Sequence, residues 1–172
     1  ETLISNLMPN LTTTYNTADF IRDDCDMKLD MCDMKEVSSS SFDVLIAFDV
    51  LEHVPNFRTA LKEINRILID NIGIAVLSVP QRDNLIKTYE DSSITAPKDR
   101  EKTFGQWDHL RIFGDEFADE VTKQGFQVLE ISWKSFNDIV ASKYMLKHPI
   151  PSSDINATNN RRIYICRKNK KR

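Results

Sequence analysis

Two apolar segments that flank an amphipathic one limit the folds open to this chain. Phe42–Phe48 and Ile74–Val79 are nearly continuous apolar runs, typical of strands buried on both faces. Between them, Asn56–Asp70 places apolar residues at helical spacing. This order predicts a βαβ crossover, in which the two strands lie side by side and parallel. We therefore expect an α/β fold built on a parallel sheet.

The segments after this unit predict one further helix and two antiparallel strands. Asp115–Gln124 is predicted to be a helix, with Gly125 as its left-handed cap. Phe126–Trp133 and Arg162–Arg167 are predicted to be strands, and no long helix is indicated between them. Because parallel strands need a long crossover, this pattern favours an antiparallel pair. Residues 135–160 would then be an insert before the last strand.

The stretch 80–113 carries few helix or strand signals. An irregular stretch of this length inside a compact domain is usually functional or mobile. We expect it to be a lid or substrate-facing segment above the strand ends. The 172 residues are about the size of one domain, so we expect a single domain over residues 1–172.

Composition excludes several classes of protein. The formal net charge of -3 gives no overall attraction to nucleic acid or anionic lipid, and no apolar run reaches the roughly 18 residues of a membrane span. We expect a small-molecule substrate and neither a nucleic-acid nor a membrane partner, while the oligomeric state is not determined. Cys25, Cys32 and Cys166 lack metal-ligand spacing, so we expect reduced thiols, a cytoplasmic location and no metal site.

Three acids follow predicted strands and would meet at one edge of the sheet: Asp19, Asp30 and Asp49. Ligands of open parallel sheets bind beyond the carboxyl ends of the strands, where a carboxylate can accept hydrogen bonds from both ribose hydroxyls. Phe20 and Met31 stand next to two of these acids and could hold a flat base between them. The alternative is that the acids are turn and cap residues on a solvated face. Their order at three strand ends favours a nucleoside site.

A motif-rich stretch covers Ser41–Pro80 and reads SFDVLIAFDVLEHVPNFRTALKEINRILIDNIGIAVLSVP. It resembles the middle of class I S-adenosylmethionine-dependent methyltransferases, which show a strand "FDV", a turn "LEHV", a helix closing in "LRPGG" and a strand ending in "VP". Glu52, His53 and Val54 stand in the family's places. Asn71–Gly73 replaces the "PGG" turn and keeps one glycine.

A second stretch, Thr88–Val128, reads TYEDSSITAPKDREKTFGQWDHLRIFGDEFADEVTKQGFQV. It resembles type 11-like members of the same family that carry "TxEDPSIT" and then "FGQxDHVRxYG". Thr17–Phe20 and Asp26–Asp33 resemble the ribose and adenine segments of those members. The likeness covers about residues 1–134 and the final strand, and FGQWDH is its more specific part.

The resemblance implies S-adenosylmethionine as the cofactor and assigns roles to the acids. Asp19, with Phe20 beside it, would bind the ribose. Asp30 would accept the adenine amino group, and the Met31 backbone amide would face the ring. Phe48 and Asp49 would face the methionine end of the cofactor.

The resemblance also implies a fold. We expect a Rossmann-like, mostly parallel sheet with an antiparallel final strand, in a three-layer αβα arrangement. The family's first strand and glycine-rich loop should lie immediately before Glu1, yet only 4 glycines are present and none precedes Gly73. That N-terminal strand, which would lie between the strands ending at Asp19 and Phe48, is expected to be missing here. We expect a preceding segment to supply it, and the chain as given to bind cofactor poorly.

A polar cluster closes the irregular stretch and is the candidate substrate site: Gln106, Asp108, His109 and Arg111. An Asp–His pair can tune an imidazole for proton removal, and an arginine can pair with a carboxylate or phosphate. We predict substrate binding by Gln106, Asp108 and Arg111, and a catalytic role for His109. The alternative is that the arginine pairs with an internal acid. His53 is expected to fix its own turn.

Three functions follow from these observations. The leading one is S-adenosylmethionine-dependent methyl transfer to a small-molecule acceptor. A truncated or degenerate methyltransferase-like domain with a binding or structural role is supported by the absent glycine loop. A nicotinamide-dependent dehydrogenase also uses an acid after its second strand. The antiparallel final pair and the FGQWDH stretch disfavour it.

Overall fold

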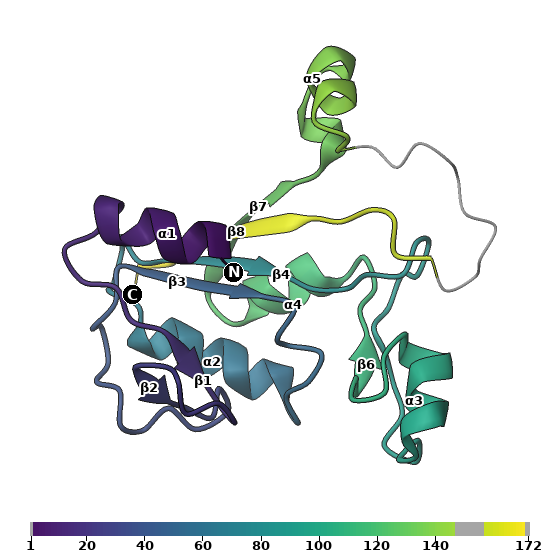
Figure 1. The fold of residues 1–172 in the computed structure, drawn as a ribbon, viewed down its shortest axis with the longest axis horizontal. Helices are drawn as coiled ribbons and strands as arrows, with labels where there is room; N and C mark the ends of the chain where they lie inside the picture. Colours follow the sequence, from purple (N-terminus) through teal and green to yellow (C-terminus); the bar gives the residue numbers. More distant parts are fainter. Residues whose placement is uncertain (1, 147–156, 171–172) are drawn as a thin grey trace.

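The computed structural model describes residues 2–146 and 157–170, and Figure 1 shows their arrangement. The chain alternates strands and helices in the expected α/β manner. Its elements are α1 (Thr2–Leu11), β1 (Ala18–Asp19), β2 (Met27–Lys28), β3 (Val44–Phe48), α2 (Phe57–Ile67), β4 (Ile74–Ser78), β5 (Tyr89–Glu90), α3 (Pro97–Phe104), β6 (Arg111–Ile112), α4 (Phe117–Lys123), β7 (Phe126–Ile131), the 3₁₀ turn η1 (Trp133–Ser135), α5 (Asp138–Lys143) and β8 (Ile163–Lys168).

The main sheet has the strand order β3-β4-β8-β7. β3 and β4 pair in parallel from Val44 opposite Ile74 to Phe48 opposite Ser78, which confirms the predicted βαβ unit. β8 is antiparallel to both β4 and β7, so β3, β4 and β7 run in one direction and only β8 is reversed. The Rossmann-like sheet with an antiparallel final strand is therefore confirmed.

Helix α2 forms because its start and its apolar face are both specified. The side chain of Asn56 accepts a hydrogen bond from the backbone N–H of Thr59 at 3.0 Å and caps the helix. The side chains that α2 buries recur at helical spacing and pack beneath the sheet: Phe57, Ala60, Leu61, Ile64 and Ile67. Figure 1 shows α1 above β3 and α2 below it, which gives the three-layer arrangement.

The first two strands form a small sheet of their own. β1 and β2 pair in parallel, with Ala18 opposite Met27 and Asp19 opposite Lys28. Within the described residues this pair shares no ladder with β3, which forms one edge of the four-stranded sheet. The arrangement agrees with a further strand between the one ending at Asp19 and the one ending at Phe48, and that strand stays a prediction.

The stretch 80–113 contains more regular structure than its sequence suggests. The expectation of few elements was wrong, because α3 lies within it and β5 pairs with β6 in an antiparallel manner. α3 has little apolar periodicity, and its ends are set by Pro97 in the first turn and Gly105 at a φ of 94°. The two ends of the stretch lie side by side, since Gln81 bridges Phe113.

The segment before the last strand projects away from the sheets. It contains η1 and the short helix α5, which stands apart from the sheet in Figure 1. Residues 147–156 of the predicted insert lie outside the described residues. No helix among the described residues has the length and apolarity needed to cross a membrane.

Candidate active site

Asp19 is the last residue of β1, and backbone N–H groups hold its carboxylate in place. Its Oδ1 accepts the backbone N–H groups of Ile21 at 2.8 Å and Arg22 at 2.9 Å. These two N–H groups lower the pKa of Asp19, so the carboxylate is ionised at neutral pH. Among the described residues, the only hydrogen bonds to this carboxylate are at Oδ1, which leaves Oδ2 for a diol. The adjacent Phe20 ring is 65% exposed.

Asp30 and Met31 follow β2 and differ in which of their groups remain free to contact a ligand. Oδ1 of Asp30 accepts the backbone N–H of Cys32 at 2.7 Å, and the carboxylate is only half-buried. The side chain of Met31 packs against the hydrophobic core, so its apolar face is partly committed to the fold. The backbone and Asp30 therefore remain the parts of this turn that could recognise a base.

Asp49 follows β3 in an unusual conformation. Its φ of 53° is in the left-handed region, which is costly for a residue with a side chain and is concentrated at functional sites. Nη1 of Arg161 lies 2.6 Å from one carboxylate oxygen and 2.7 Å from the other. The Phe48 side chain beside it is 38% exposed. A cationic group of a ligand would therefore compete with Arg161 for Asp49.

Arg111 holds the turn after β3 against the end of the 80–113 stretch. Its guanidinium donates to the carbonyls of Leu51 at 2.8 Å, Val54 at 2.6 Å and Pro55 at 3.0 Å, and to the carboxylate of Glu90 at 3.0 Å. The residue is 2% exposed, and its donors point at protein groups. This geometry matches the alternative of an internally paired arginine. Substrate binding by Arg111 stays a prediction, because these internal contacts do not test it.

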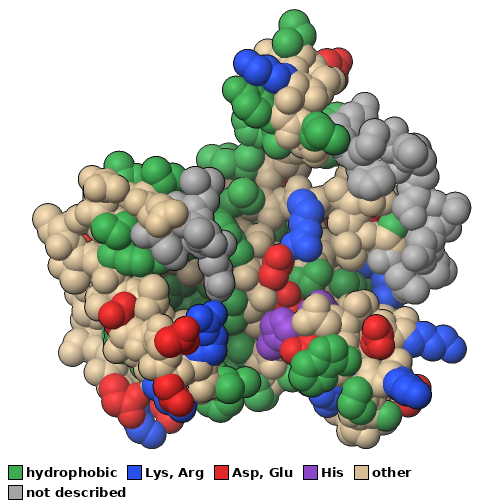
Figure 2. Space-filling view, in the orientation of Figure 1, with side chains coloured by type: hydrophobic (Ala, Val, Ile, Leu, Met, Phe, Trp, Pro, Cys, Tyr) green, Lys and Arg blue, Asp and Glu red, His purple; other side chains and the backbone are tan. Residues whose placement is uncertain are grey.

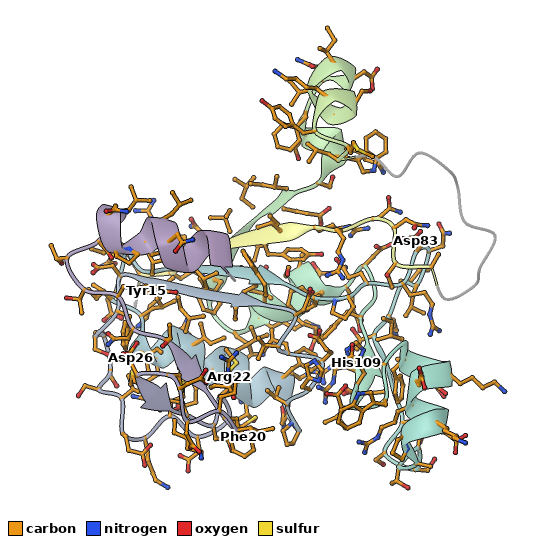
Figure 3. The ribbon with its side chains drawn as sticks, in the orientation of Figure 1. Tyr15, Phe20, Arg22, Asp26, Asp83 and His109 are labelled. Atoms are coloured by element: carbon orange, nitrogen blue, oxygen red, sulfur yellow. The ribbon has the colours of Figure 1, made fainter. Side chains whose placement is uncertain are left out.

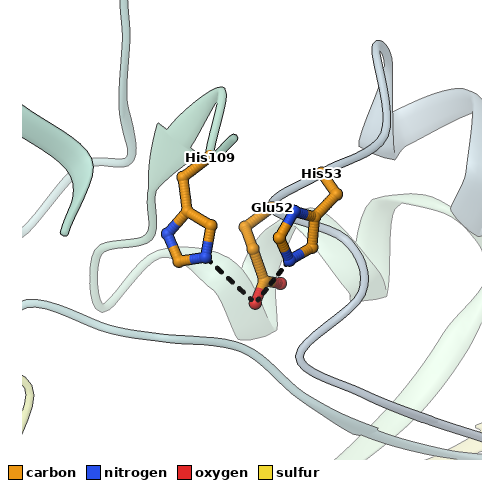
Figure 4. Close-up of side chains that lie close together, drawn as sticks. All are labelled: Glu52, His53 and His109. Atoms are coloured by element: carbon orange, nitrogen blue, oxygen red, sulfur yellow. Dashed lines mark ion pairs between the residues drawn. The ribbon is translucent and has the colours of Figure 1, made fainter. Parts of the chain in front are cut away.

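The same contact region brings two histidines onto one buried carboxylate, as Figure 4 shows. Oε1 of Glu52 lies 3.9 Å from Nε2 of His53 and 3.9 Å from Nε2 of His109. The two imidazole rings meet edge to face, with centroids 4.8 Å apart. Glu52 is 1% exposed, and its buried Oε2 has no hydrogen-bond partner among the described residues.

Burial changes the protonation of this cluster. It raises the pKa of Glu52 to about 8 and lowers the pKa of His109. Nδ1 of His109 lies 3.1 Å from the carbonyl oxygen of Phe104, which can only accept, so Nδ1 carries the proton. Nε2 of a neutral His109 then presents a lone pair toward Glu52.

Asp108 contacts His53 rather than its neighbour in sequence. Its Oδ2 lies 3.2 Å from Nδ1 of His53, and its Oδ1 accepts from Nε2 of Gln106 at 2.8 Å. Burial opposes ionisation, but the Gln106 hydrogen bond and the nearby His53 imidazole keep the pKa of Asp108 below its usual value. The predicted pairing chemistry of Asp108 is therefore directed at His53.

A hollow separates the two groups of candidates on the face drawn in Figure 2. In Figure 3, Phe20 and Arg22 lie at the end of the β1 segment, and His109 lies across from them. Histidine side chains, drawn in purple, border the hollow in Figure 2. In this view Phe20 and His109 lie on opposite sides of the hollow.

Comparison with known proteins identifies the family. Residues 11–131 match the profile of a methyltransferase domain. This chain belongs to the methyltransferase domain family. The resemblance to class I S-adenosylmethionine-dependent methyltransferases is confirmed, and the protein is accordingly a methyltransferase-type enzyme. No curated protein matches the chain.

Solved structures share the fold of this methyltransferase domain at low identity. A provisionally assigned methyltransferase from Bacillus halodurans has 12% identity and a TM-score of 0.59, over 97% of this chain and 87% of that one. An S-adenosylmethionine-dependent methyltransferase from Mesorhizobium loti has 11% identity and a TM-score of 0.50, over 85% and 72%. The [4+2]-cyclase SpnF has 17% identity and a TM-score of 0.50, over 83% of this chain and 56% of that one.

Sequence reasoning missed the carboxylate at the centre of the cluster. Glu52 and His53 appear in the "LEHV" turn only as family signature residues, and His53 is expected to serve its own turn. His109 lies 56 positions after His53, so no spacing rule could join them. The signal that could have found the cluster is the adjacent Glu–His pair directly after a strand end.

Proposed function

We propose that this methyltransferase transfers a methyl group from S-adenosylmethionine to a small-molecule acceptor. The observation that carries the proposal is the set of carboxylates at three strand ends, Asp19, Asp30 and Asp49, within the stretch that matches the methyltransferase family. Each follows a strand of a parallel pair, at the edge where ligands of such sheets bind.

The residues present fit the cofactor at its nucleoside end. Asp19 is ionised and keeps one oxygen for the ribose hydroxyls, and the exposed ring of Phe20 could pack against the base. Asp30 would accept the adenine amino group, and Phe48 and Asp49 would hold the methionine end. When bound, S-adenosylmethionine supplies an activated methyl group, and alignment of donor and acceptor then supplies much of the catalysis.

His109 would remove a proton from the acceptor where the acceptor needs it. Burial lowers the pKa of His109, so its imidazole is neutral and able to accept a proton at pH 7. Gln106 and Asp108 would contact the acceptor from the same segment.

We also propose that residues 80–113 form the substrate-facing segment. Trp107, which is 60% exposed and close in sequence to His109, supports this proposal. Three free cysteines support a cytoplasmic location.

Calorimetry with S-adenosylhomocysteine tests the proposal on the full chain. Asp19→Ala should weaken binding by about 1.5–3 kcal/mol, the scale of lost charge-assisted hydrogen bonds. Asp24→Ala is the matched control, because Asp24 is an exposed acid of the same loop that pairs with Arg22. Equal affinities of the Asp19 variant and the wild type would remove Asp19 from the site.

The reaction needs a separate test, because the same fold supports different chemistry. The cyclase that shares the fold catalyses a [4+2] reaction, as its name states. Transfer of a labelled methyl group into acceptor products distinguishes methyl transfer from such a reaction. Cofactor binding without label transfer to any acceptor would favour a role in which the cofactor is held but not consumed.

A further inference from the structure

The cluster of Glu52, His53 and His109 has the donor set of a metal site. Its three candidate ligand atoms, one carboxylate oxygen and two imidazole nitrogens, lie within 4.8 Å of one another. These atoms come from the turn after β3 and from the segment before β6. Arg111 connects the two segments by donating to the carbonyls of Leu51 and Val54. Two histidines and one carboxylate are a donor set found in zinc enzymes and in non-haem iron enzymes.

Both histidines carry their ring proton on Nδ1, so the Nε2 lone pair of each points toward the Glu52 carboxylate. The Phe104 carbonyl fixes the proton of His109 on Nδ1. Asp108 does the same for His53, because a carboxylate 3.2 Å from Nδ1 favours the proton on that nitrogen. A carbonyl or carboxylate behind a ligating histidine is the usual arrangement around protein-bound metal ions.

The distances in the cluster suit a cation better than a shared proton. At 3.9 Å, each Nε2 is too far from Oε1 of Glu52 for a hydrogen bond. Two ligands of one tetrahedral Zn²⁺ lie about 3.3 Å apart, because each bond is about 2.0–2.2 Å long. Side-chain shifts of several tenths of an ångström would therefore bring both nitrogens and the oxygen into one coordination sphere.

The buried carboxylate gives an independent reason for a ligand. Glu52 is 1% exposed, and within the part of the chain that the structure describes its Oε2 has no hydrogen-bond partner. An unpartnered buried carboxylate oxygen is costly, and native proteins rarely keep one without a cause. A cation bound between Oε1 of Glu52 and the two histidines would balance the charge of this buried carboxylate and offset part of that cost.

We propose that Glu52, His53 and His109 bind one divalent transition-metal ion of the Zn²⁺ class. Nitrogen donors favour Zn²⁺, Co²⁺ or Ni²⁺ over Mg²⁺ and Ca²⁺, which prefer oxygen ligands. Three protein ligands leave a coordination position open, and His53, with its side chain 32% exposed, lies on the open side of the cluster. The proposal revises the expectation of no metal site and does not depend on methyl transfer. With an ion bound, Nε2 of His109 is a ligand, so His109 could act as the base only in the metal-free protein.

Titration calorimetry with Zn²⁺ alone tests the site on chelator-treated, dialysed protein. The Cys25→Ser, Cys32→Ser double variant serves as the background, so that these half-buried thiols do not bind the probe. We expect one Zn²⁺ per chain and no comparable binding of Mg²⁺. Glu52→Gln and His53→Ala should each weaken Zn²⁺ binding about 100-fold or more, and Asp108→Asn about 10- to 100-fold.

Asp24→Asn is the matched control and should leave Zn²⁺ affinity unchanged, since Asp24 pairs with Arg22 at the surface. Circular dichroism checks that each variant is folded; Glu52→Gln keeps the side chain's shape if His53→Ala does not fold. Co²⁺ absorption gives a second readout, because its visible bands should change when a histidine ligand is lost. No Zn²⁺ binding, or binding equal in the wild type and both ligand variants, would overturn the proposal.

Discussion

Arg161 covers Asp49 from the far end of the chain, with Nη1 at 2.6 Å and 2.7 Å from the two carboxylate oxygens. The side chains are 58% and 42% exposed, and pairs of this kind contribute at most about 1 kcal/mol to stability. The pair nevertheless occupies the carboxylate assigned to the methionine end of the cofactor. It is therefore a better candidate for controlling affinity than for holding the fold together.

Arg161→Gln should tighten S-adenosylhomocysteine binding several-fold, because the ligand amino group would no longer compete with a guanidinium for Asp49. The midpoint of urea unfolding should stay nearly constant, which separates an effect on the site from an effect on folding. Asp49→Asn is the partner variant and should weaken binding. If both variants bind with wild-type affinity by calorimetry, Asp49 lies outside the cofactor site.

Arg111→Lys should lower the free energy of unfolding by about 2–4 kcal/mol, because a lysine cannot reach the carbonyls of Leu51, Val54 and Pro55 together. Urea denaturation measures the loss. Arg167→Lys is the control, since Arg167 is exposed and donates to one carbonyl, that of Asn71. Wild-type stability of the Arg111 variant with a raised KM would instead support the substrate role predicted from the sequence.

Tyr164→Phe should cost about 1–2 kcal/mol of stability, because it removes a buried hydrogen bond. The Tyr164 hydroxyl donates to Oε1 of Gln81 at 2.6 Å, and both residues are buried. Thermal or urea unfolding gives the difference. Tyr144→Phe, at a site 62% exposed, should be neutral. Equal losses in the two variants would show that the hydroxyl at Tyr164 adds nothing specific.

The stability of the chelator-treated protein should fall as the pH rises from 5 to 8. Burial raises the pKa of Glu52 from its ordinary value of 4.5 to about 8, so the folded chain keeps a proton that the unfolded chain releases. The stability that this group contributes is fully present below pH 4.5. It is lost as the pH approaches 8, by up to about 1.4 kcal/mol per pH unit. Urea midpoints across this range measure the slope, and Glu52→Gln should flatten it.

The sequence was informative where local pattern and burial agree. The two apolar runs and the helix between them predict β3, α2 and β4, and the missing crossover predicts the antiparallel β8. Helix α3 was missed because its ends, not an apolar face, define it. The shared site of the strand-end acids stays a prediction, because among the described residues β1 and β2 pair in a sheet of their own, apart from β3.

The adjacent Glu52 and His53 could be noticed in the sequence, but the assembly of their cluster with His109 could not be predicted from it. This assembly depends on long-range contacts: Leu110 donates to the Glu52 carbonyl at 2.9 Å, and Arg111 spans the turn. The same contacts turn Asp108 toward His53 instead of His109. Such relationships follow from tertiary packing, which spacing along the chain does not encode.

The bridge between Gln81 and Phe113 makes the stretch between them a closed loop on a fixed base. Gln81 also donates to the Gly114 carbonyl at 2.9 Å, so both ends are tied to buried residues whatever happens at the tip. Lengthening a loop whose ends are already joined costs little additional closure entropy. The chain can therefore exchange or extend the region around α3, the segment proposed to face an acceptor, without rebuilding the sheet on which it stands.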